Sequence, residues 1–280
     1  MVTKQQLQQL QDTACALRHH IVDMIGCQDG KVGHLGGSCS ATDVVTCLYF
    51  YKMNLDPKNL QDPARSRFLL SKGHAALVQY AALAELGVIP KEELKNVKKR
   101  GSMLQGHPDR SKTPGIEANT GSLGQGLSIG LGLALGMRLD GIDEKVYVMM
   151  GDGEQAEGQI WEAAIAAAAY KMDNMVAILD HNKVQAMGTV EERLRLGCLA
   201  EKWRAFGWHV LEVDGHDLQQ VCDALDEADT IKGKPVILVA NTIKGKGVSF
   251  AEGKATFHNC GLTPEQFQQA HELIDITAHQ

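Results

Sequence analysis

The sequence predicts an α/β protein built on a doubly wound, mainly parallel β-sheet. Two apolar runs at residues 146–150 and 176–179 enclose a helical stretch, which is the order of a βαβ unit with parallel strands. Three more strand candidates alternate with helical segments, a pattern typical of an open sheet covered by helices on both faces. No repeat, low-complexity tract or linker interrupts the 280 residues, so a single domain over residues 1–280 is expected.

The N-terminal half contains one strand candidate among helices. Its first helix carries apolar residues at helical spacing, and His19 and His20 are interpreted as ordinary residues of that helix. Ser40-x-x-Asp43 predicts an N-cap box at the start of the second helix. The predicted elements are, in order, a helix over residues 4–25, a glycine-rich loop over 30–37, a helix from Ser40 to Tyr51, a strand over 67–71, an Ala-rich helix to Leu86, a short helix from Pro90, a long loop over 106–119 and a small-residue helix to about Arg138.

The C-terminal half contains the other four strand candidates. Asp217 is a suitable cap for one helix, and Pro264 suits the first turn of the last one. The predicted elements are a strand over residues 146–150, a helix starting near Gly158, a strand over 176–179, a polar loop over 183–192, a helix ending near Phe206, a strand over 208–213, a helix from Asp217 to about Thr230, a strand over 235–240 and a terminal helix from Thr263.

The composition argues against nucleic-acid and membrane partners. The formal net charge is −6, and no basic run extends beyond Lys98-Lys99-Arg100. No apolar run reaches the roughly 18 residues that a membrane-spanning helix needs, and the polar N-terminus is unlike a signal peptide. The seven cysteines are scattered without a Cys-x-x-Cys pair, which suits a reducing compartment. The expected location is therefore cytoplasmic.

The loop after residue 150 has two competing interpretations. Gly151-Asp-Gly-Glu-Gln-Ala156 fits the G-x-G-x-x-A fingerprint of an NAD-dependent dehydrogenase, with Asp180 as the ribose-binding acid. Asp152, however, would repel a pyrophosphate by about 4 kcal/mol at a separation of about 4 Å and an effective dielectric of about 20. A divalent cation reverses that sign, and Mg²⁺ prefers oxygen ligands such as those of Asp152 and Asn182. We therefore interpret the loop as part of a site for a diphosphate held through Mg²⁺.

Several other polar residues are expected at the same edge of the sheet. His74, Asp152, Asn182 and Lys244 each follow a predicted strand, and the carboxyl ends of parallel strands meet at one edge. Three more histidines lie in glycine-flanked or irregular stretches, where ligand-facing groups concentrate. Imidazole can donate, accept and shuttle protons near neutral pH, which suits chemistry among hydroxyl groups. These histidines are His34, His107 and His258.

Sequence motifs along nearly the whole chain resemble those of thiamine-diphosphate enzymes. Gly151-Asp152-Gly153 precedes His181-Asn182 by 27 residues, as Gly-Asp-Gly precedes Asn-Asn in the thiamine-diphosphate signature, with His181 replacing the first Asn. Further stretches occur in the order found in transketolases: Gly33-His34, Phe68-Leu-Leu-Ser-Lys-Gly-His74, Gly106-His107-Pro108, Thr120-Gly-Ser-Leu-Gly-Gln-Gly126 and Gly245-Lys-Gly-Val-Ser-Phe250. The chain resembles the N-terminal, diphosphate-binding subunit of a split transketolase.

The resemblance implies roles for individual residues. Mg²⁺ would be held by Asp152, Asn182 and the backbone oxygen of Val184. Thiamine diphosphate would be contacted by His74, Gly121, Leu123, Asp152, Gly153, Asn182, Lys244 and His258, and Glu157 would meet the partner's activating glutamate. His34, His74, His107 and His258 would act as catalytic residues on the hydroxyls of the ketose. Leu35 and Ser122 stand where the family usually has proline, which leaves the substrate preference open.

The activity implied is the transfer of a two-carbon ketol unit from a ketose phosphate to an aldose phosphate. The pyrimidine-binding and C-terminal domains of a full-length transketolase have no counterpart here. The resemblance therefore implies a partner chain that carries them, with two copies of each chain. Three alternatives stay open: a deoxyxylulose-phosphate synthase component, a 2-oxo acid dehydrogenase component and an NAD-dependent dehydrogenase. A scaffold without activity of its own is a fourth.

Overall fold

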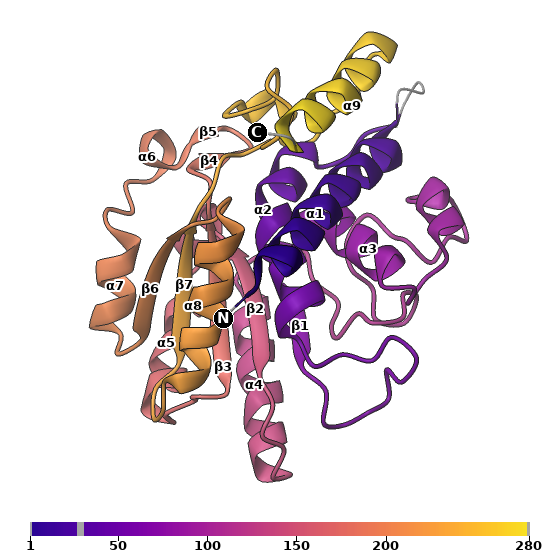
Figure 1. The fold of residues 1–280 in the computed structure, drawn as a ribbon. Helices are drawn as coiled ribbons and strands as arrows, with labels where there is room; N and C mark the ends of the chain where they lie inside the picture. Colours follow the sequence, from indigo (N-terminus) through magenta and orange to yellow (C-terminus); the bar gives the residue numbers. More distant parts are fainter. Residues whose placement is uncertain (1, 27–30, 279–280) are drawn as a thin grey trace.

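A five-stranded parallel sheet forms the centre of the protein in the computed structural model, which describes residues 2–26 and 31–278 (Figure 1). Cys27 lies outside the described residues. Each neighbouring pair of strands is parallel, as predicted. Across the sheet the strands are β1 (Arg67–Leu70), β2 (Val146–Gly151), β3 (Met175–His181), β7 (Val236–Asn241) and β6 (His209–Asp214).

Helices cover both faces of the sheet, so that two hydrophobic cores form. Met149 and Ile178 face one core, whereas their neighbours Val148 and Ala177 face the other. This alternation explains why the strands read as continuous apolar runs, because a parallel sheet is buried on both faces. The first core is closed by α1 (Lys4–Ile25), α2 (Leu35–Cys47), α3 (Ala76–Glu85) and α8 (Leu218–Thr230), and the second by α4 (Gln125–Leu139), α5 (Gly158–Ala169) and α7 (Leu199–Ala205). The doubly wound α/β fold is therefore confirmed.

The predicted N-cap box at Ser40 and Asp43 is wrong. Helix α2 already begins at Leu35, so Ser40 and Asp43 lie in its interior rather than at its start. Their side chains bind buried partners on other elements instead of capping the helix. Ser40 Oγ donates to Asp180 Oδ2 at 2.7 Å, and Asp43 accepts two hydrogen bonds from Arg18 at 2.9 and 2.6 Å. The helical path continues past Cys47 as a π-helix, η1 (Leu48–Lys52).

Short elements occupy several connecting segments. The polar loop predicted at residues 183–192 contains a small hairpin, β4 (Val184–Gln185) with β5 (Gly188–Thr189), and the helix α6 (Val190–Arg193). The loop over residues 106–119 has neither helix nor strand, as predicted. The remaining elements are the 3-10 helices η2 (Gly73–Ala75), η3 (Lys91–Asn96), η4 (Gly153–Ala156) and η5 (Ala255–Phe257), and the last helix α9 (Pro264–Ala278).

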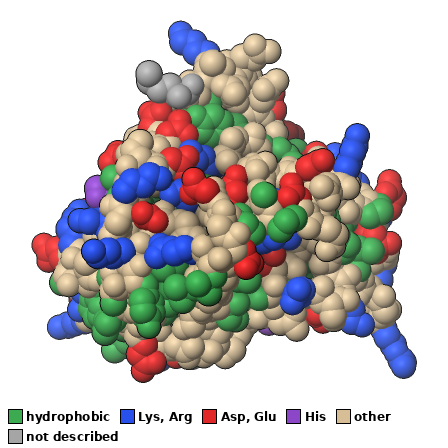
Figure 2. Space-filling view, turned by 90° about the horizontal axis from the view of Figure 1, so that it is seen from below, with side chains coloured by type: hydrophobic (Ala, Val, Ile, Leu, Met, Phe, Trp, Pro, Cys, Tyr) green, Lys and Arg blue, Asp and Glu red, His purple; other side chains and the backbone are tan. Residues whose placement is uncertain are grey.

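The surface mixes charges of both signs. Figure 2 shows the face that lies at the bottom of Figure 1, where Lys and Arg side chains alternate with Asp and Glu, and hydrophobic side chains gather in one area. Exposed apolar side chains include Leu139 at the end of α4 and Ile165 on α5. Across residues 2–26 and 31–278, none of the helices combines the length and the apolar character needed to cross a bilayer.

Candidate active site

The carboxyl ends of β1, β2, β3 and β7 meet at one edge of the sheet, as predicted. Gly151 at the end of β2 pairs with Asp180 of β3, and His181 pairs with Asn241 of β7. The segments that follow these strands surround a cavity of about 180 Å³. Predicted site residues that line it are His74, Leu123, Asp152, Gly153, Asn182, Val184, Lys244 and His258.

Asp152 is a buried carboxylate without a cationic partner. Its side chain is 3% exposed and accepts hydrogen bonds only from the backbone N–H groups of Gly153, at 2.7 Å, and Lys183. Among the described residues no Lys, Arg or His forms an ion pair with it. Burial, followed by the nearby Asp180 carboxylate, raises the pKa of Asp152. A charge held in this way is costly unless a cation is supplied from outside the chain.

The oxygens around Asp152 fit a hard divalent cation. Asn182 is buried beside the cavity, with its Oδ1 accepting from Val184 N at 3.1 Å. A carboxylate, an amide oxygen and the backbone oxygen of Val184 form the oxygen-only donor set that Mg²⁺ prefers. That backbone oxygen accepts a hydrogen bond of 2.8 Å from Lys244 Nζ, and a carbonyl has a second lone pair. His181 stands where the motif described above has its first asparagine, and its Nδ1 contacts Asn241 Oδ1 at 3.2 Å. The next residue, Asn182, still lines the cavity.

Asp180, at the end of the neighbouring strand, is fully paired inside the protein. It is 1% exposed, forms a buried ion pair with Lys72 and accepts hydrogen bonds from Ser40, Thr242 and Asn182. Burial opposes its ionisation, but Lys72 and these donors lower its pKa to about 2. The carboxylate is therefore buried and engaged by partners of the framework, which argues against the ribose contact that the dehydrogenase interpretation required.

Sequence reasoning missed Glu154 as well as the pair of Lys72 and Asp180. Glu154 is buried and accepts from Ser71 Oγ, from Gly124 N at 2.9 Å and from Gly151 N at 3.0 Å. It ties the end of β1 and the turn before α4 to the end of β2. Its place directly after Gly-Asp-Gly was the available signal, but its partners Ser71 and Gly124 come from distant parts of the chain.

The four predicted histidines lie together. The ring centroid of His34 is 5.3 Å from that of His74, 5.4 Å from that of His258 and 6.1 Å from that of His107. Burial, with nearby lysines adding to it, lowers the pKa of His34 to about 4, of His74 to about 2 and of His258 to about 3. His107 is exposed, and its pKa is also lowered. His34, His74 and His258 are therefore neutral near pH 7, when each ring can both donate and accept a hydrogen bond.

Lys244 connects the histidines to the residues around Asp152. Its Nζ lies 3.0 Å from His258 Nδ1 and donates to Val184 O. Burial, together with the positive charge of Lys72, lowers the pKa of the Lys244 ammonium to about 8. The side chain therefore carries its charge near neutral pH at the wall of the cavity.

Gly121 and Glu157 lie beside the cavity rather than in its lining. Gly121 has φ +133°, and a Cβ there would lie 2.7 Å from His107 Cδ2, so only glycine fits. Glu157 is exposed at the N-terminus of α5, and a Cβ on Gly124 would lie 2.7 Å from its own Cβ. Glu157 therefore borders the glycine-rich turn and faces solvent.

A backbone bridge joins the two segments that carry His34 and His258. Gly33 N donates to Cys260 O and Cys260 N donates to Gly33 O, both at 2.9 Å. The residues next to this bridge in the sequence bring His34 and His258 together. The bridge therefore holds two histidines in contact that are far apart in sequence.

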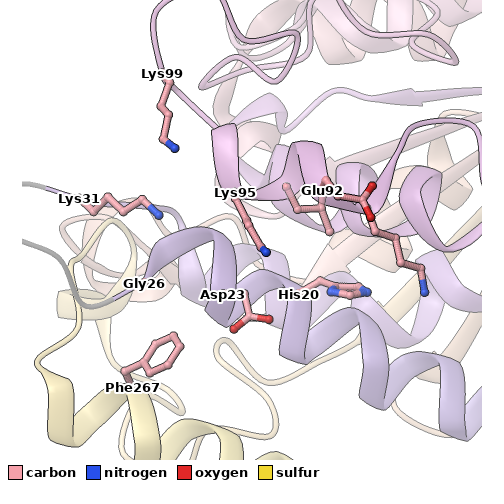
Figure 3. Close-up of a pocket in the computed structure, with 10 residues that line it drawn as sticks. His20, Asp23, Gly26, Lys31, Glu92, Lys95, Lys99 and Phe267 are labelled. Atoms are coloured by element: carbon pink, nitrogen blue, oxygen red, sulfur yellow. The ribbon is translucent and has the colours of Figure 1, made fainter.

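A larger cavity of about 650 Å³ lies away from this cluster (Figure 3). It opens between α1, η3 and α9, and the side chains of Lys31, Lys95, Lys99 and Asp23 lie around it. None of the predicted site residues lines it. The chemistry of the side chains, rather than cavity size, therefore identifies the candidate site.

Comparison with known proteins identifies the family to which this fold belongs. The family model described as "Transketolase, thiamine diphosphate binding domain" matches residues 10–279. The 6-deoxy-6-sulfo-D-fructose transketolase subunit SqwG of Clostridium sp. (strain MSTE9) is 45% identical over 93% of this chain and 94% of its own length. A subunit of the apulose-4-phosphate transketolase of Phocaeicola vulgatus is 43% identical over 90% of this chain and 89% of its own length.

Longer relatives match over less than half of their length. Human transketolase is 38% identical over 97% of this chain but only 43% of its own. The crystal structure of the Pichia stipitis transketolase in complex with sedoheptulose 7-phosphate has a TM-score of 0.90 at 29% identity, covering 98% of this chain and 42% of that one. The match to the family model covers nearly all of the sequence. The chain therefore belongs to the transketolase family and corresponds to its thiamine diphosphate binding domain.

Proposed function

We propose that this chain is the diphosphate-binding subunit of a two-chain transketolase. It would bind thiamine diphosphate through Mg²⁺ and, with its partner, transfer a two-carbon ketol unit between a ketose phosphate and an aldose phosphate. Residues 1–280 would act as one domain. The observation that carries the proposal is Asp152, a buried carboxylate that forms no ion pair with the described residues, at a cavity lined by Lys244 and two histidines.

Asp152, Asn182 and Val184 O would hold the cation, and Gly153 would let the backbone approach the diphosphate. Thiamine diphosphate, when bound, supplies the nucleophilic carbon and stores the electron pair left after a carbon–carbon bond breaks. The ammonium of Lys244 would neutralise part of the diphosphate charge. Leu123 and Gly121 would line the cofactor's aminopyrimidine side.

The histidines would position the sugar and move its hydroxyl protons. His34, His74 and His258 are neutral at neutral pH, so each ring can accept a hydroxyl proton at one nitrogen while donating from the other. His107 is exposed beside His34, where an incoming sugar would meet it. The Lys98 ammonium is close enough to lower the pKa of both His34 and His107, and a positive charge there favours an anionic sugar.

A second chain is supported by length and by surface. The relatives that match end to end are named as transketolase subunits, and full-length transketolases extend well beyond the matched region. Glu157 is exposed next to the cavity, where an activating glutamate of the partner would reach it. The exposed side chains of Leu139, Ile165 and Tyr170, on or next to α4 and α5, would suit a protein contact. Two copies of each chain in the cytoplasm complete the proposal.

The test is reconstitution from purified chains. This chain alone should bind thiamine diphosphate weakly and only with Mg²⁺, and should not turn over. Adding a chain that carries the pyrimidine-binding and C-terminal domains should restore ketol transfer. Asp152→Ala should abolish the activity of the mixture, whereas Asp140→Asn, a change at an exposed aspartate of the α4 C-terminus, should not. Turnover by this chain without a partner, or cofactor binding unaffected by a chelator, would refute the proposal.

A further inference from the structure

Helices α1 and α9 lie side by side, and four polar side chains meet on the seam between them (Figure 1). Cys15 and His19 are one turn apart on α1, and His271 and Asp275 are one turn apart on α9. The spacing of four residues places each pair on one face of its helix. Ligand atoms of Cys15, His19 and Asp275 all lie within 4.8 Å of one another.

A chain of contacts crosses this seam from one carboxylate to another. Asp275 Oδ1 lies 2.9 Å from His19 Nε2, and His19 Nδ1 lies 2.6 Å from His271 Nδ1. The second nitrogen of the same ring, His271 Nε2, lies 3.2 Å from Asp23 Oδ1. Two imidazoles therefore stand in series between two carboxylates. Asp23 also borders the neighbouring cavity of Figure 3, as does Phe267, whose ring packs against His271 with centroids 4.7 Å apart.

The row of contacts from Asp275 to Asp23 needs more protons than two neutral imidazoles carry. A carboxylate oxygen and an unprotonated ring nitrogen can both only accept a hydrogen bond. Each of the three contacts is therefore a hydrogen bond only if one of its two atoms carries a proton, so three protons are needed. Two neutral imidazoles carry one N–H each, which leaves one contact without a proton. Either a third proton or a metal ion would fill that place.

The position of Cys15 favours a metal ion at the Asp275 end. With a cation between Asp275 and His19, the His19 Nδ1–H donates to His271 and the His271 Nε2–H donates to Asp23, so every contact is satisfied. A metal-bound histidine usually donates its other N–H to such a partner. Burial and the Asp275 carboxylate raise the pKa of the Cys15 thiol, and a dication beside both groups would offset these effects.

We propose that Cys15, His19 and Asp275 bind a zinc-type divalent ion that clasps α9 to α1, with water as the fourth ligand. Thiolate, imidazole and carboxylate are ligands of Zn²⁺, whereas Mg²⁺ prefers oxygen alone. Asp275 is 65% exposed, which leaves its carboxylate free to adjust to the ion. This site is separate from the oxygen ligands around Asp152, and it does not depend on the proposed function.

Cobalt(II) is the probe that separates the two sites, because a thiolate–cobalt charge-transfer band requires a sulfur ligand. The untagged, chelator-treated chain should develop this band with one equivalent of Co²⁺, together with the strong visible bands of tetrahedral cobalt, and Zn²⁺ should displace it. Cys15→Ser should abolish the band. Cys198→Ser, a change at an exposed cysteine elsewhere, should leave it intact. Absence of the band, or its persistence in Cys15→Ser, would overturn the proposal.

A second set of variants tests the chain of contacts itself. Asp23→Asn and His271→Asn should retain the band but weaken zinc binding by about 10- to 100-fold, the usual effect of losing a hydrogen-bonding partner of a ligand. Asp275→Asn, at an exposed position, should fold normally and also bind zinc more weakly. Zn²⁺ should raise the melting temperature of the wild type but not of Cys15→Ser. Equal zinc affinity in the wild type and Asp23→Asn would contradict the proposed support of the ligands by the contacts from His19 through His271 to Asp23.

Discussion

The ends of β2 and β3 each carry a buried aspartate, but only one of the two has a cationic side chain beside it. Asp152 and Asp180 are both buried aspartates at the carboxyl edge of the sheet, and Gly151 next to Asp152 pairs directly with Asp180. Asp180 has the Lys72 ammonium beside it, whereas Asp152 has only backbone N–H donors. The Asp180 carboxylate is therefore part of the framework, and that of Asp152 is left for a cation from outside.

The largest effect is expected when the internal pair is broken. Lys72→Met leaves Asp180 buried without its counter-charge, and removing one member of a buried ion pair typically costs about 3–5 kcal/mol. Urea unfolding of the chain should show this loss. Lys202→Met, at an exposed lysine of α7, is the matched control and should change the free energy of unfolding by less than about 0.5 kcal/mol. A Lys72 variant as stable as the control would mean that the two aspartates do not differ.

The two aspartates should also respond oppositely to pH. The folded pKa of Asp180, about 2, lies below its ordinary value of 3.8. The ionised Asp180 therefore contributes about 2 kcal/mol to the free energy of unfolding above about pH 4, and this contribution is lost as pH falls toward 2. Carboxyl NMR should find Asp180 ionised down to the lowest pH at which the chain stays folded. Protonation of Asp180 above pH 4 in the folded chain would contradict the assignment.

Asp152→Asn should stabilise the cofactor-free chain by about 1 kcal/mol, a typical gain when a functional residue that strains the fold is replaced. Because burial raises the folded pKa of Asp152 above 3.8, the wild-type penalty is absent below that ordinary value, grows as pH rises above it and is complete above the folded pKa. The gain should therefore appear only above about pH 4. The same variant should lose Mg²⁺-dependent binding of thiamine diphosphate, measured by calorimetry. A loss of stability at neutral pH would count against the comparison.

The smallest effect on stability is expected a few residues after Asp152. Glu157 is exposed, so Glu157→Gln should change the free energy of unfolding by less than about 0.5 kcal/mol. Ketol transfer by the reconstituted pair of chains should nevertheless fall, with cofactor binding by this chain alone unchanged. Unaltered activity would show that this carboxylate does not serve the partner.

The fold could be predicted because each strand is an apolar run between polar or glycine-containing segments. The edge of the sheet that carries the site could be predicted because the carboxyl ends of parallel strands lie at the same edge. His74, Asp152, Asn182 and Lys244 could be placed because they follow strands. Buried partners could not be predicted, since pairing Lys72 with Asp180 requires knowing which strand ends are neighbours.

The same limit explains one wrong prediction and one contact that the sequence did not reveal. Ser40 has the local signature of a helix cap, but a buried carboxylate on β3 is its real partner. His19 has the spacing of an ordinary helix residue, and only the packing of α9 on α1 shows the second histidine beside it. In both cases local patterns identify helices correctly while the partner comes from a distant segment.

The bridge between Gly33 and Cys260 also sets an order for biosynthesis. The sheet can pair once β7 has emerged from the ribosome, but His258 can join His34 only after the segment that follows has been made. A nascent chain would thus possess its framework before it possesses its reaction centre. The segment that follows β7 completes the histidine cluster, so the sheet can form before His34 and His258 are brought together.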